Sequence, residues 1–316
     1  MRYTLGPVTP EHYPRMAAII TAQSREVTTA EELLREDRLR PKEYPHFRIG
    51  AFTPEGILMG YAGTGSGGSN RPGEFGIRVR VDEPYRGQGI GRALYEQVLA
   101  YARSKGATRL ETMVREDFPD AIAWAERRGF ATEHHLFQST LSLTEWDPTP
   151  FQEVLARVTA SGIRFTTLAA ETRDGDRVAA LRRYYAFSHR LAKDIPGQSD
   201  RPDTPWEHYL TWVTNDPHWK DELIVLAADG DRWVALCQMN PQESGSLYNG
   251  FTAVDREYRG RNLALAVKVK GLELARETGA SFIRTNNHSV NAPMLAVNRK
   301  LGYVPEPGFF HMAARI

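Results

Sequence analysis

The sequence predicts two tandem α/β units, each with helices packed around a largely antiparallel sheet. Three observations lead to this fold class. The 316-residue chain contains an internal repeat, each half mixes strand-like and helix-like periodicity, and two prolines interrupt regular structure between the halves. The predicted domains are residues 1–147 and 148–316, divided within the stretch 146–150.

The repeat is clearest over residues 81–107, which align without a gap with residues 254–280. Of these 27 positions, 11 are identical, whereas ordinary amino-acid usage gives about two by chance. The register holds farther along, because Gly129-Phe130 falls opposite Gly302-Tyr303. The two halves therefore share one plan.

In each half, a strand with alternating apolar residues leads through a glycine-containing loop into an amphipathic helix. In the first half Phe75, Ile77, Val79 and Val81 share one strand face, and Ile90, Leu94, Val98 and Tyr101 share one helix face. Further strands are predicted at 48–52, 57–62, 108–114, 247–254 and 281–285, and further helices at 117–128, 263–274 and 291–301.

Composition and charge exclude several classes of protein. The net charge of +1 does not favour binding to nucleic acid or to an anionic membrane. No stretch of 18 apolar residues and no secretory leader is present, so we expect no membrane span and a cytoplasmic location. Cys237 is the only cysteine and is expected to be a buried structural thiol. No metal is expected, since no histidine or acidic cluster has ligand spacing.

The segment Arg86-Gly87-Gln88-Gly89-Ile90-Gly91 carries the clearest chemical signal. Free main-chain N–H groups at a helix start favour an anion, and glycines allow close approach of a phosphate. The arginine adds a charge-assisted donor. We therefore predict a pyrophosphate-binding loop here.

A second glycine-rich segment, residues 63–68, also fits the spacing of a dinucleotide-binding turn. No helix is predicted after it, because Asn70-Arg71-Pro72-Gly73 follows. The dinucleotide motif needs a strand–turn–helix context, so this segment is interpreted as a hairpin loop.

The stretch 81–91 resembles the acetyl-CoA motif of the GNAT family, the Gcn5-related N-acetyltransferases, and the resemblance recurs over 254–264. It implies two tandem GNAT folds that use acetyl-CoA as acetyl donor. The residues that it assigns to acetyl-CoA are Val79, Arg80, Val81, Arg86, Gly87, Gln88, Gly89, Ile90 and Gly91 in the first half, and Thr252, Ala253, Val254, Arg259, Gly260, Arg261, Asn262, Leu263, Ala264 and Asn291 in the second.

The second loop departs from the motif at Asn262, which stands where Gly89 stands. Asparagine adopts positive φ more readily than other residues with a side chain. We therefore expect the second loop to keep its shape and its ligand.

The catalytic residues are less clear. Many family members use a tyrosine, seven residues after an asparagine, as proton donor; here Asn291 is followed by Asn298, and the first half has Phe118 and Ala125. The resemblance to tandem family members favours the second half, with Asn287, His288 and Tyr184 as candidates. Structural roles compete: Asn287 and Asn291 as helix caps, His288 as a loop residue, and one of Tyr184 and Tyr185 as core.

The implied function is acetyl transfer from acetyl-CoA to the primary amine of a small molecule, by a monomer or homodimer. Two alternatives remain open at this point. In the first alternative, both halves bind CoA without transfer, as in a regulatory protein. In the second, one half is catalytic and the other is a structural partner.

Overall fold

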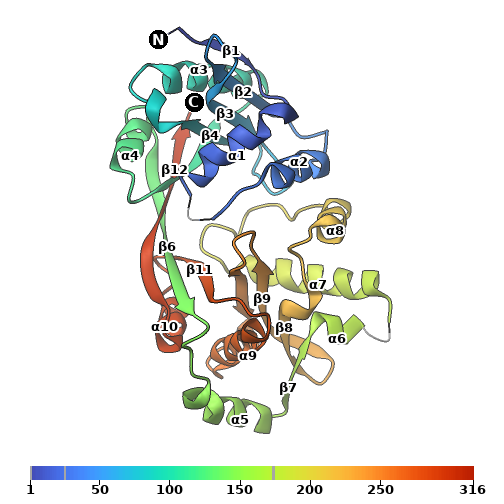
Figure 1. The fold of residues 1–316 in the computed structure, drawn as a ribbon. Helices are drawn as coiled ribbons and strands as arrows, with labels where there is room; N and C mark the ends of the chain where they lie inside the picture. Colours follow the sequence, from blue (N-terminus) through green and yellow to red (C-terminus); the bar gives the residue numbers. More distant parts are fainter. Residues whose placement is uncertain (1, 25, 173–174) are drawn as a thin grey trace. The chain divides into compact units, whose positions relative to one another are not determined.

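The computed structural model describes residues 2–24, 26–172 and 175–316, which form two compact units. Unit 1 comprises residues 1–133, 202–205 and 310–316, and unit 2 comprises residues 134–201 and 206–309. Each unit is a mixed α/β fold with a mostly antiparallel sheet, as predicted (Figure 1). The units are interleaved along the chain, so the domain boundary at 147/148 stays a prediction.

The sheet of unit 1 has the strand order β1-β2-β3-β4-β5, with the end of β12 beside β5. All its neighbouring strands from β1 to β4 are antiparallel, whereas β4 and β5 are parallel. The strands are β1 (Thr4–Pro7), β2 (His46–Phe52), β3 (Leu58–Gly65), β4 (Glu74–Val81), β5 (Arg109–Arg115) and the last residues of β12 (Val304–Arg315). The helices are α1 (Tyr13–Thr21), α2 (Ala30–Leu39), α3 (Ile90–Ser104) and α4 (Pro119–Glu126).

Unit 1 places helices on both faces of its sheet. Successive strand residues point to opposite sides, and a β-bulge at Met59 of β3 shifts this alternation by one residue. Met59 and Ala62 of β3 pack with Leu94 and Val98 of α3 in one core. Leu58 and Tyr61 of the same strand pack in a second core with α1 and α2. The predicted helix face is confirmed by Ile90, Leu94 and Val98, which are fully buried.

The sheet of unit 2 has the order β12-β6-β11-β10-β9-β8-β7, to which β12 contributes its first residues. Its strands are β6 (Ala131–Ser142), whose first three residues belong to unit 1, β7 (Ile163–Thr167), β8 (Ile224–Asp229), β9 (Arg232–Pro241), β10 (Leu247–Val254) and β11 (Phe282–His288). Its helices are α5 (Gln152–Ala160), α6 (Leu168–Thr172), α7 (Arg177–Ala192), α8 (Trp206–Asn215), α9 (Leu263–Glu277) and α10 (Ala292–Leu301).

Unit 2 repeats the two-sided packing of unit 1. Val225 and Ala227 of β8 face a core with α9 and α5, whereas Leu226 and Ala228 face a core with α7 and α8. Cys237 is 2% exposed and lies in the first of these cores, which confirms that its thiol is buried.

One prediction about the strands was wrong. The sequence suggests that β11 ends near residue 285, but the strand continues to His288. Its antiparallel neighbour β6 supplies partners for the extra residues, with Asn287 opposite Phe137 and His288 opposite Leu136. The polar residues at the end of β11 are therefore held in a regular strand by pairing with the long strand β6, although local sequence patterning assigns them to a loop.

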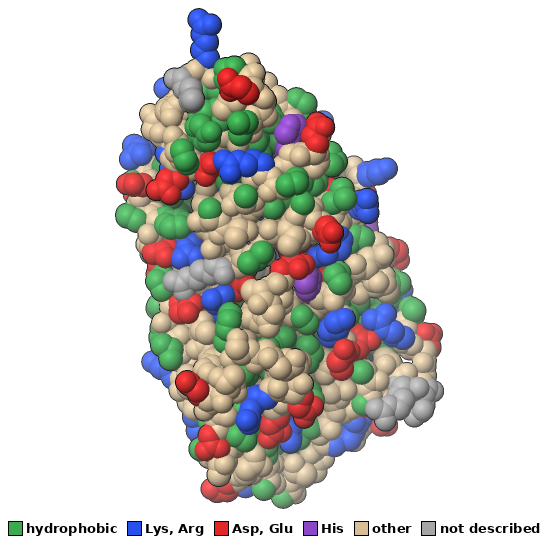
Figure 2. Space-filling model, viewed as in Figure 1, with side chains coloured by type: hydrophobic (Ala, Val, Ile, Leu, Met, Phe, Trp, Pro, Cys, Tyr) green, Lys and Arg blue, Asp and Glu red, His purple; other side chains and the backbone are tan. Residues whose placement is uncertain are grey.

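The described surface is mixed in charge. Figure 2 shows acidic and basic side chains interspersed over the face in view, with single apolar side chains between them, in keeping with the net charge of +1. No helix among the described residues is both long and apolar enough to cross a membrane.

The tight approach of β12 to β6 yields a stability prediction. A Cβ atom on Gly308 would lie 2.0 Å from the main-chain oxygen of Leu136, so the backbone has to move to admit a side chain. Gly308→Ala should lower the free energy of unfolding by about 1–3 kcal/mol, the usual cost of overpacking. Chemical denaturation measures it. Gly63→Ala is the control, because its nearest atom lies at 3.6 Å; equal stability of the two variants would contradict the prediction.

Candidate active site

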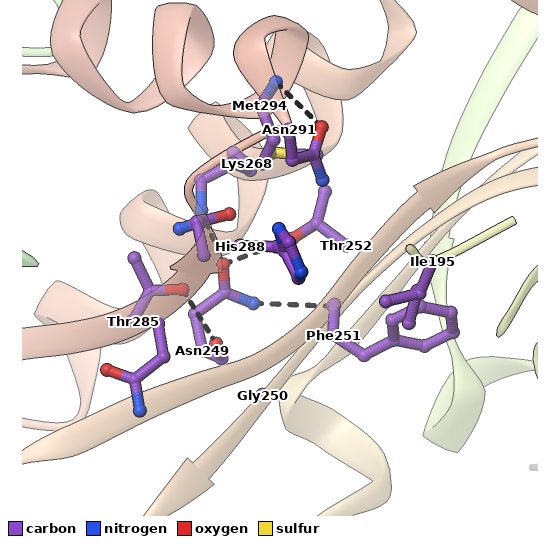
Figure 3. Close-up of a pocket in the computed structure, with 12 residues that line it drawn as sticks. Ile195, Asn249, Gly250, Phe251, Thr252, Lys268, Thr285, His288, Asn291 and Met294 are labelled. Atoms are coloured by element: carbon purple, nitrogen blue, oxygen red, sulfur yellow. Dashed lines mark hydrogen bonds between the residues drawn. The ribbon is translucent and has the colours of Figure 1, made fainter. Parts of the chain in front are cut away.

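A pocket opens in unit 2 where two parallel strands separate. Among the described residues, β10 and β11 pair only at Leu247 with Ile283 and at Tyr248 with Arg284. Beyond that point both strands, α9, α10 and the segment after α7 contribute to the pocket wall (Figure 3). The lining residues are Ile195, Asn249, Gly250, Phe251, Thr252, Lys268, Thr285, Asn286, Asn287, His288, Asn291 and Met294.

A β-bulge shapes one wall of this pocket. The register between β9 and β10 shifts between Asn249 and Phe251, so Gly250 is the extra residue. A bulge leaves main-chain groups outside the ladder and bends the strand, and Gly250 itself lines the pocket. In unit 1 the equivalent pairing of β3 with β4 runs without a shift from Gly60 with Val81 to Gly65 with Gly76.

The buried side chain of Asn249 holds the bulge together. Its Nδ2 donates to the main-chain oxygens of Gln238 on β9 (2.8 Å) and Phe251 on β10 (3.3 Å), so it bonds to both strands at the irregularity. Its Oδ1 accepts from the hydroxyl of Thr252 (3.0 Å) and from the ammonium of Lys268. The main-chain oxygen of Asn249 accepts from the hydroxyl of Thr285 at 3.0 Å, as the dashed line in Figure 3 shows.

The two predicted anion-binding loops have the same backbone shape. Gly89 is the N-cap of α3 at φ 80°, and Asn262 is the N-cap of α9 at φ 62°. Gly87 and Gly260 also have positive φ, 75° and 77°. Among the described residues Asn262 is the single non-glycine residue at positive φ, which confirms that asparagine replaces glycine there without a change of conformation.

The arginines that open these loops stabilise the loop shape. The Nε of Arg86 donates to the main-chain oxygen of Val81 at 3.1 Å, and the Nε of Arg259 donates to that of Val254 at 3.3 Å. Each guanidinium thus ties its loop back to the end of the preceding strand. Asp82 and Asp255 cap the short helical turn between strand and loop in both units.

In unit 2 an acidic residue, Asp194, binds two arginines at the start of the loop. Asp194 accepts hydrogen bonds from Arg256 (2.8 Å) and from Arg259. The bond from Arg256 is the main reason that the pKa of this carboxyl is lowered, so the pairing is present at neutral pH and is lost as acid protonates Asp194. The next residue, Ile195, lines the pocket.

The structure brings together most, but not all, of the residues predicted for catalysis. Asn287 and His288 line the pocket and are 8% and 9% exposed. Asn291 also lines it and caps α10, since its side chain accepts from the amide of Met294. Tyr184 lies instead in the core under α7 and α8, 1% exposed, where its hydroxyl donates to Oε1 of Gln238 at 2.8 Å. Burial raises its pKa well above the ordinary value.

The remaining cofactor assignments occupy the ends of the strands next to the loops. Val79, Arg80 and Val81 pair with Ala62, Tyr61 and Gly60 of β3. Thr252, Ala253 and Val254 pair with Cys237, Leu236 and Ala235 of β9. Both sets lie beyond the point where the parallel strands stop pairing, and Thr252 reaches the pocket.

Sequence reasoning missed Lys268. This lysine of α9 is 2% exposed and lines the pocket, and burial lowers its pKa to about 8. A signal was available, because α9 is apolar almost all round, with Leu265, Ala266, Val267 and Val269 buried. A cation inside such a helix has to be buried as well.

Asn298, at the position of the family tyrosine, does not line the pocket. It is 2% exposed, and neither polar atom of its side chain has a hydrogen-bond partner among the described residues. Asn298 is therefore part of the interior of α10 rather than a proton donor to the pocket.

Each unit thus combines a separating pair of parallel strands with the loop and helix start predicted to bind the pyrophosphate of acetyl-CoA. The family model described as the acetyltransferase (GNAT) family matches the chain twice, over residues 15–130 and 189–303. The chain belongs to the GNAT family and is an N-acetyltransferase. Proteins of this family use acetyl-CoA as the acetyl donor.

The chain is similar to curated relatives and to solved structures over most of its length. The mycothiol acetyltransferase of Clavibacter michiganensis subsp. michiganensis is 28% identical over 234 residues, which cover 73% of this chain and 70% of that protein. That of Saccharomonospora viridis is 26% identical over 261 residues, 80% of this chain and 79% of that protein. A tandem GNAT protein from the clavulanic acid biosynthesis pathway has a TM-score of 0.73 at 17% identity, over 99% of this chain and 98% of its own, and shows the shared fold.

The left-handed conformation of Asn262 yields a prediction for ligand binding. Asn262→Ala should weaken acetyl-CoA binding by unit 2 by about 5- to 30-fold, because an alanine lacks asparagine's local hydrogen bonds and costs about 1–2 kcal/mol at this φ. Asn262→Gly should bind at least as well as wild type. Calorimetric titration measures both, in a chain whose first loop is blocked by Gly89→Trp. Equal affinities for the alanine and glycine variants would show that φ at this position does not matter.

Proposed function

We propose that unit 2 transfers the acetyl group of acetyl-CoA to the primary amine of a small molecule, and that both loops bind acetyl-CoA. In each unit the main-chain amides at the helix start would hold the pyrophosphate. The acetyl-bearing arm would follow the gap between the parallel strands toward the position where unit 2 has its pocket.

The observation that carries the assignment to unit 2 is an unpaired donor beside the bulge. The side-chain Nδ2 of Asn287 is buried, lines the pocket and has no hydrogen-bond partner among the described residues. A buried donor without a partner is costly unless a ligand satisfies it. A thioester carbonyl oxygen, which gains negative charge during attack by an amine, is such an acceptor.

His288 is proposed to act beside Asn287. Its Nδ1 accepts the main-chain amide of Val290 at 3.3 Å, so the neutral ring carries its proton on Nε2. A ring in this state donates a hydrogen bond to the carbonyl oxygen or to the acceptor. Asn291 and Thr252 complete a polar wall that orients the two substrates.

Support for a small-molecule acceptor comes from the relatives. The matches that extend over most of both chains are to proteins named mycothiol acetyltransferase. The pocket also contains no carboxylate among its described lining residues, so the acceptor amine would be bound through neutral hydrogen-bonding groups rather than as an ion pair.

The alternative is a CoA-binding regulatory protein. It is favoured by one observation, the absence of the family tyrosine at Asn298 and at Ala125. The experiment below separates the two, because a regulatory protein binds acetyl-CoA without releasing CoA to any amine.

The division of labour between the units gives a direct test. Wild type should bind two acetyl-CoA molecules per chain and release CoA with a panel of small amines. Gly89→Trp and Asn262→Trp should each leave one binding site, because bulky residues do not fit positive φ in these loops. Turnover should survive Gly89→Trp and be lost in Asn262→Trp. Calorimetry and a thiol-detection assay measure both properties.

The reverse pattern, with turnover lost only in Gly89→Trp, would move the reaction to unit 1. Binding by wild type without CoA release from any amine would favour the regulatory alternative. Circular dichroism of both variants controls for folding.

A second prediction concerns Asn287. Asn287→Ala should lower kcat about 10²–10³-fold, the usual cost of removing one donor to a developing oxyanion, with little change in acetyl-CoA affinity. Asn215→Ala, a surface asparagine of α8, is the control. A loss of affinity without a loss of kcat would instead assign Asn287 to ground-state binding.

A further inference from the structure

Acetyl transfer from a thioester leaves a thiolate that has to be protonated, and the pocket offers few groups for that task. Among its lining residues only Lys268 and His288 have titratable side chains. Tyr184 lies in a core away from the pocket, and the amide side chain of Asn298 has no acidic proton. The donor of this proton has therefore to be sought at Lys268 or His288.

The position of Lys268 is unusual for a lysine. It lies on the helix whose N-terminus forms the second anion-binding loop, five residues beyond the start of the helix at Leu263. Its side chain is 2% exposed, and its Nζ donates to Oδ1 of Asn249 and lies 4.9 Å from the ring centroid of Tyr303. An ammonium has three donors, so a further N–H is left for a ligand in the pocket.

The contacts of Lys268 place its ammonium at the bulge. Asn249 supports the main chain of Phe251, and Gly250, Phe251 and Lys268 line the same pocket (Figure 3). The thioester is proposed to bind there. Fully burying a lysine costs free energy unless its charge is used or compensated, and no carboxylate lines this pocket to pair with it.

We propose that Lys268 is a catalytic residue that donates a proton to the departing sulfur of CoA, an inference that rests on the proposed transfer in unit 2. The acceptor amine attacks the thioester carbon, and a C–N bond forms. The C–S bond then breaks, its electron pair goes to sulfur, and the sulfur takes a proton from the ammonium. The nitrogen releases one proton to solvent, and the neutral lysine regains one from solvent after CoA leaves.

The surroundings of Lys268 suit a proton donor that works near neutral pH. Burial lowers its pKa to about 8, close to the ordinary pKa of a thiol. The titratable groups that face it are the thiol of Cys237 on β9, the hydroxyl of Tyr303 after α10 and the ring of His288 on β11. Burial raises the pKa values of Cys237 and Tyr303, so both stay neutral. The rate should fall as pH rises through the pKa of Lys268, because the donor is then deprotonated.

Unit 1 provides an internal comparison. The repeat places Tyr95 at the position of Lys268. Once the extra residue Gly250 is allowed for, the strand pairing places Ile77 at the position of Asn249. Tyr95 packs edge-on against Trp124 in an apolar core, and β4 has no bulge. The ammonium, the asparagine and the bulge thus occur together in unit 2, whereas the matching positions of α3 and β4 in unit 1 carry none of them.

The first test needs no acceptor and no turnover. The ultraviolet absorbance of the thiolate, after subtraction of the protein alone, gives the pKa of the CoA thiol bound in unit 2 of a Gly89→Trp chain. A nearby ammonium lowers a thiol pKa, so the bound thiol should titrate at least one pKa unit lower in the parent chain than with Lys268→Gln. The glutamine amide still offers an N–H to Oδ1 of Asn249, but it carries no charge and is far too weak an acid to protonate a thiolate. Lys270→Gln, a half-exposed lysine of the same helix that pairs with Glu273, is the charge-matched control.

The second test is kinetic. Lys268→Gln should lower kcat at least about 100-fold, the usual contribution of a general acid, and should remove the alkaline limb of the pH profile. Affinity for acetyl-CoA should change less than about threefold, and Lys270→Gln should behave as wild type. Lys268→Met serves as a second variant of similar length if the glutamine variant does not fold, as judged by thermal melting.

Three results would overturn the inference. They are an unchanged thiol pKa with Lys268→Gln, an alkaline limb that persists without the lysine, or intact-mass evidence that Lys268 itself becomes acetylated during turnover. Failure of the proposed function is a separate outcome, because wild type would then release no CoA while the thiol titration still reports on Lys268.

Discussion

The site of unit 2 depends on the separation of two parallel strands, β10 and β11. When β10 and β11 stop pairing, their main-chain groups lose ladder partners, and buried main-chain groups need replacements. The hydroxyl of Thr285 supplies one to Asn249, and the amide of Asn249 supplies two more across the bulge. These side chains keep the gap between the strands open and polar, and the pocket, the bulge and the proposed chemistry all occupy that gap.

The strand–loop–helix segment and the floor of the site are preserved to different degrees between the two units. The strand–loop–helix segment has the same φ angles, the same arginine bond to the strand end and the same aspartate cap in both units. The floor of the site differs, because Tyr95 and Ile77 stand where unit 2 has Lys268 and Asn249. The loop geometry that is proposed to hold acetyl-CoA is present in both halves, whereas the groups that would perform the chemistry are concentrated in one.

How much the sequence could predict depended on the range of the interactions. The loops, their positive φ and the buried helix faces follow from nearby residues, and these were predicted, including the conformation of Asn262. The extension of β11 through His288 depends on β6, more than 140 residues earlier in the chain, and local patterning could not reveal it. Tyr184 and Tyr185 are neighbours on one helix, so periodicity indicated that one was core but not which. Lys268 was overlooked because a lysine is normally assigned to the surface.

The last residues of the chain have a consequence for biosynthesis. Phe310–Ile316 belong to unit 1, where Met312 and Ala314 are buried in the core with α3 and the amide of Ile316 donates to the main-chain oxygen of Thr108. Synthesis proceeds from the N-terminus, and domains usually fold as they emerge. The first unit, although most of it is made first, lacks a strand of its sheet and part of its core until residues 310–316 have been synthesised. Its incomplete sheet edge therefore has to remain protected from other chains while the whole of the second unit is being made.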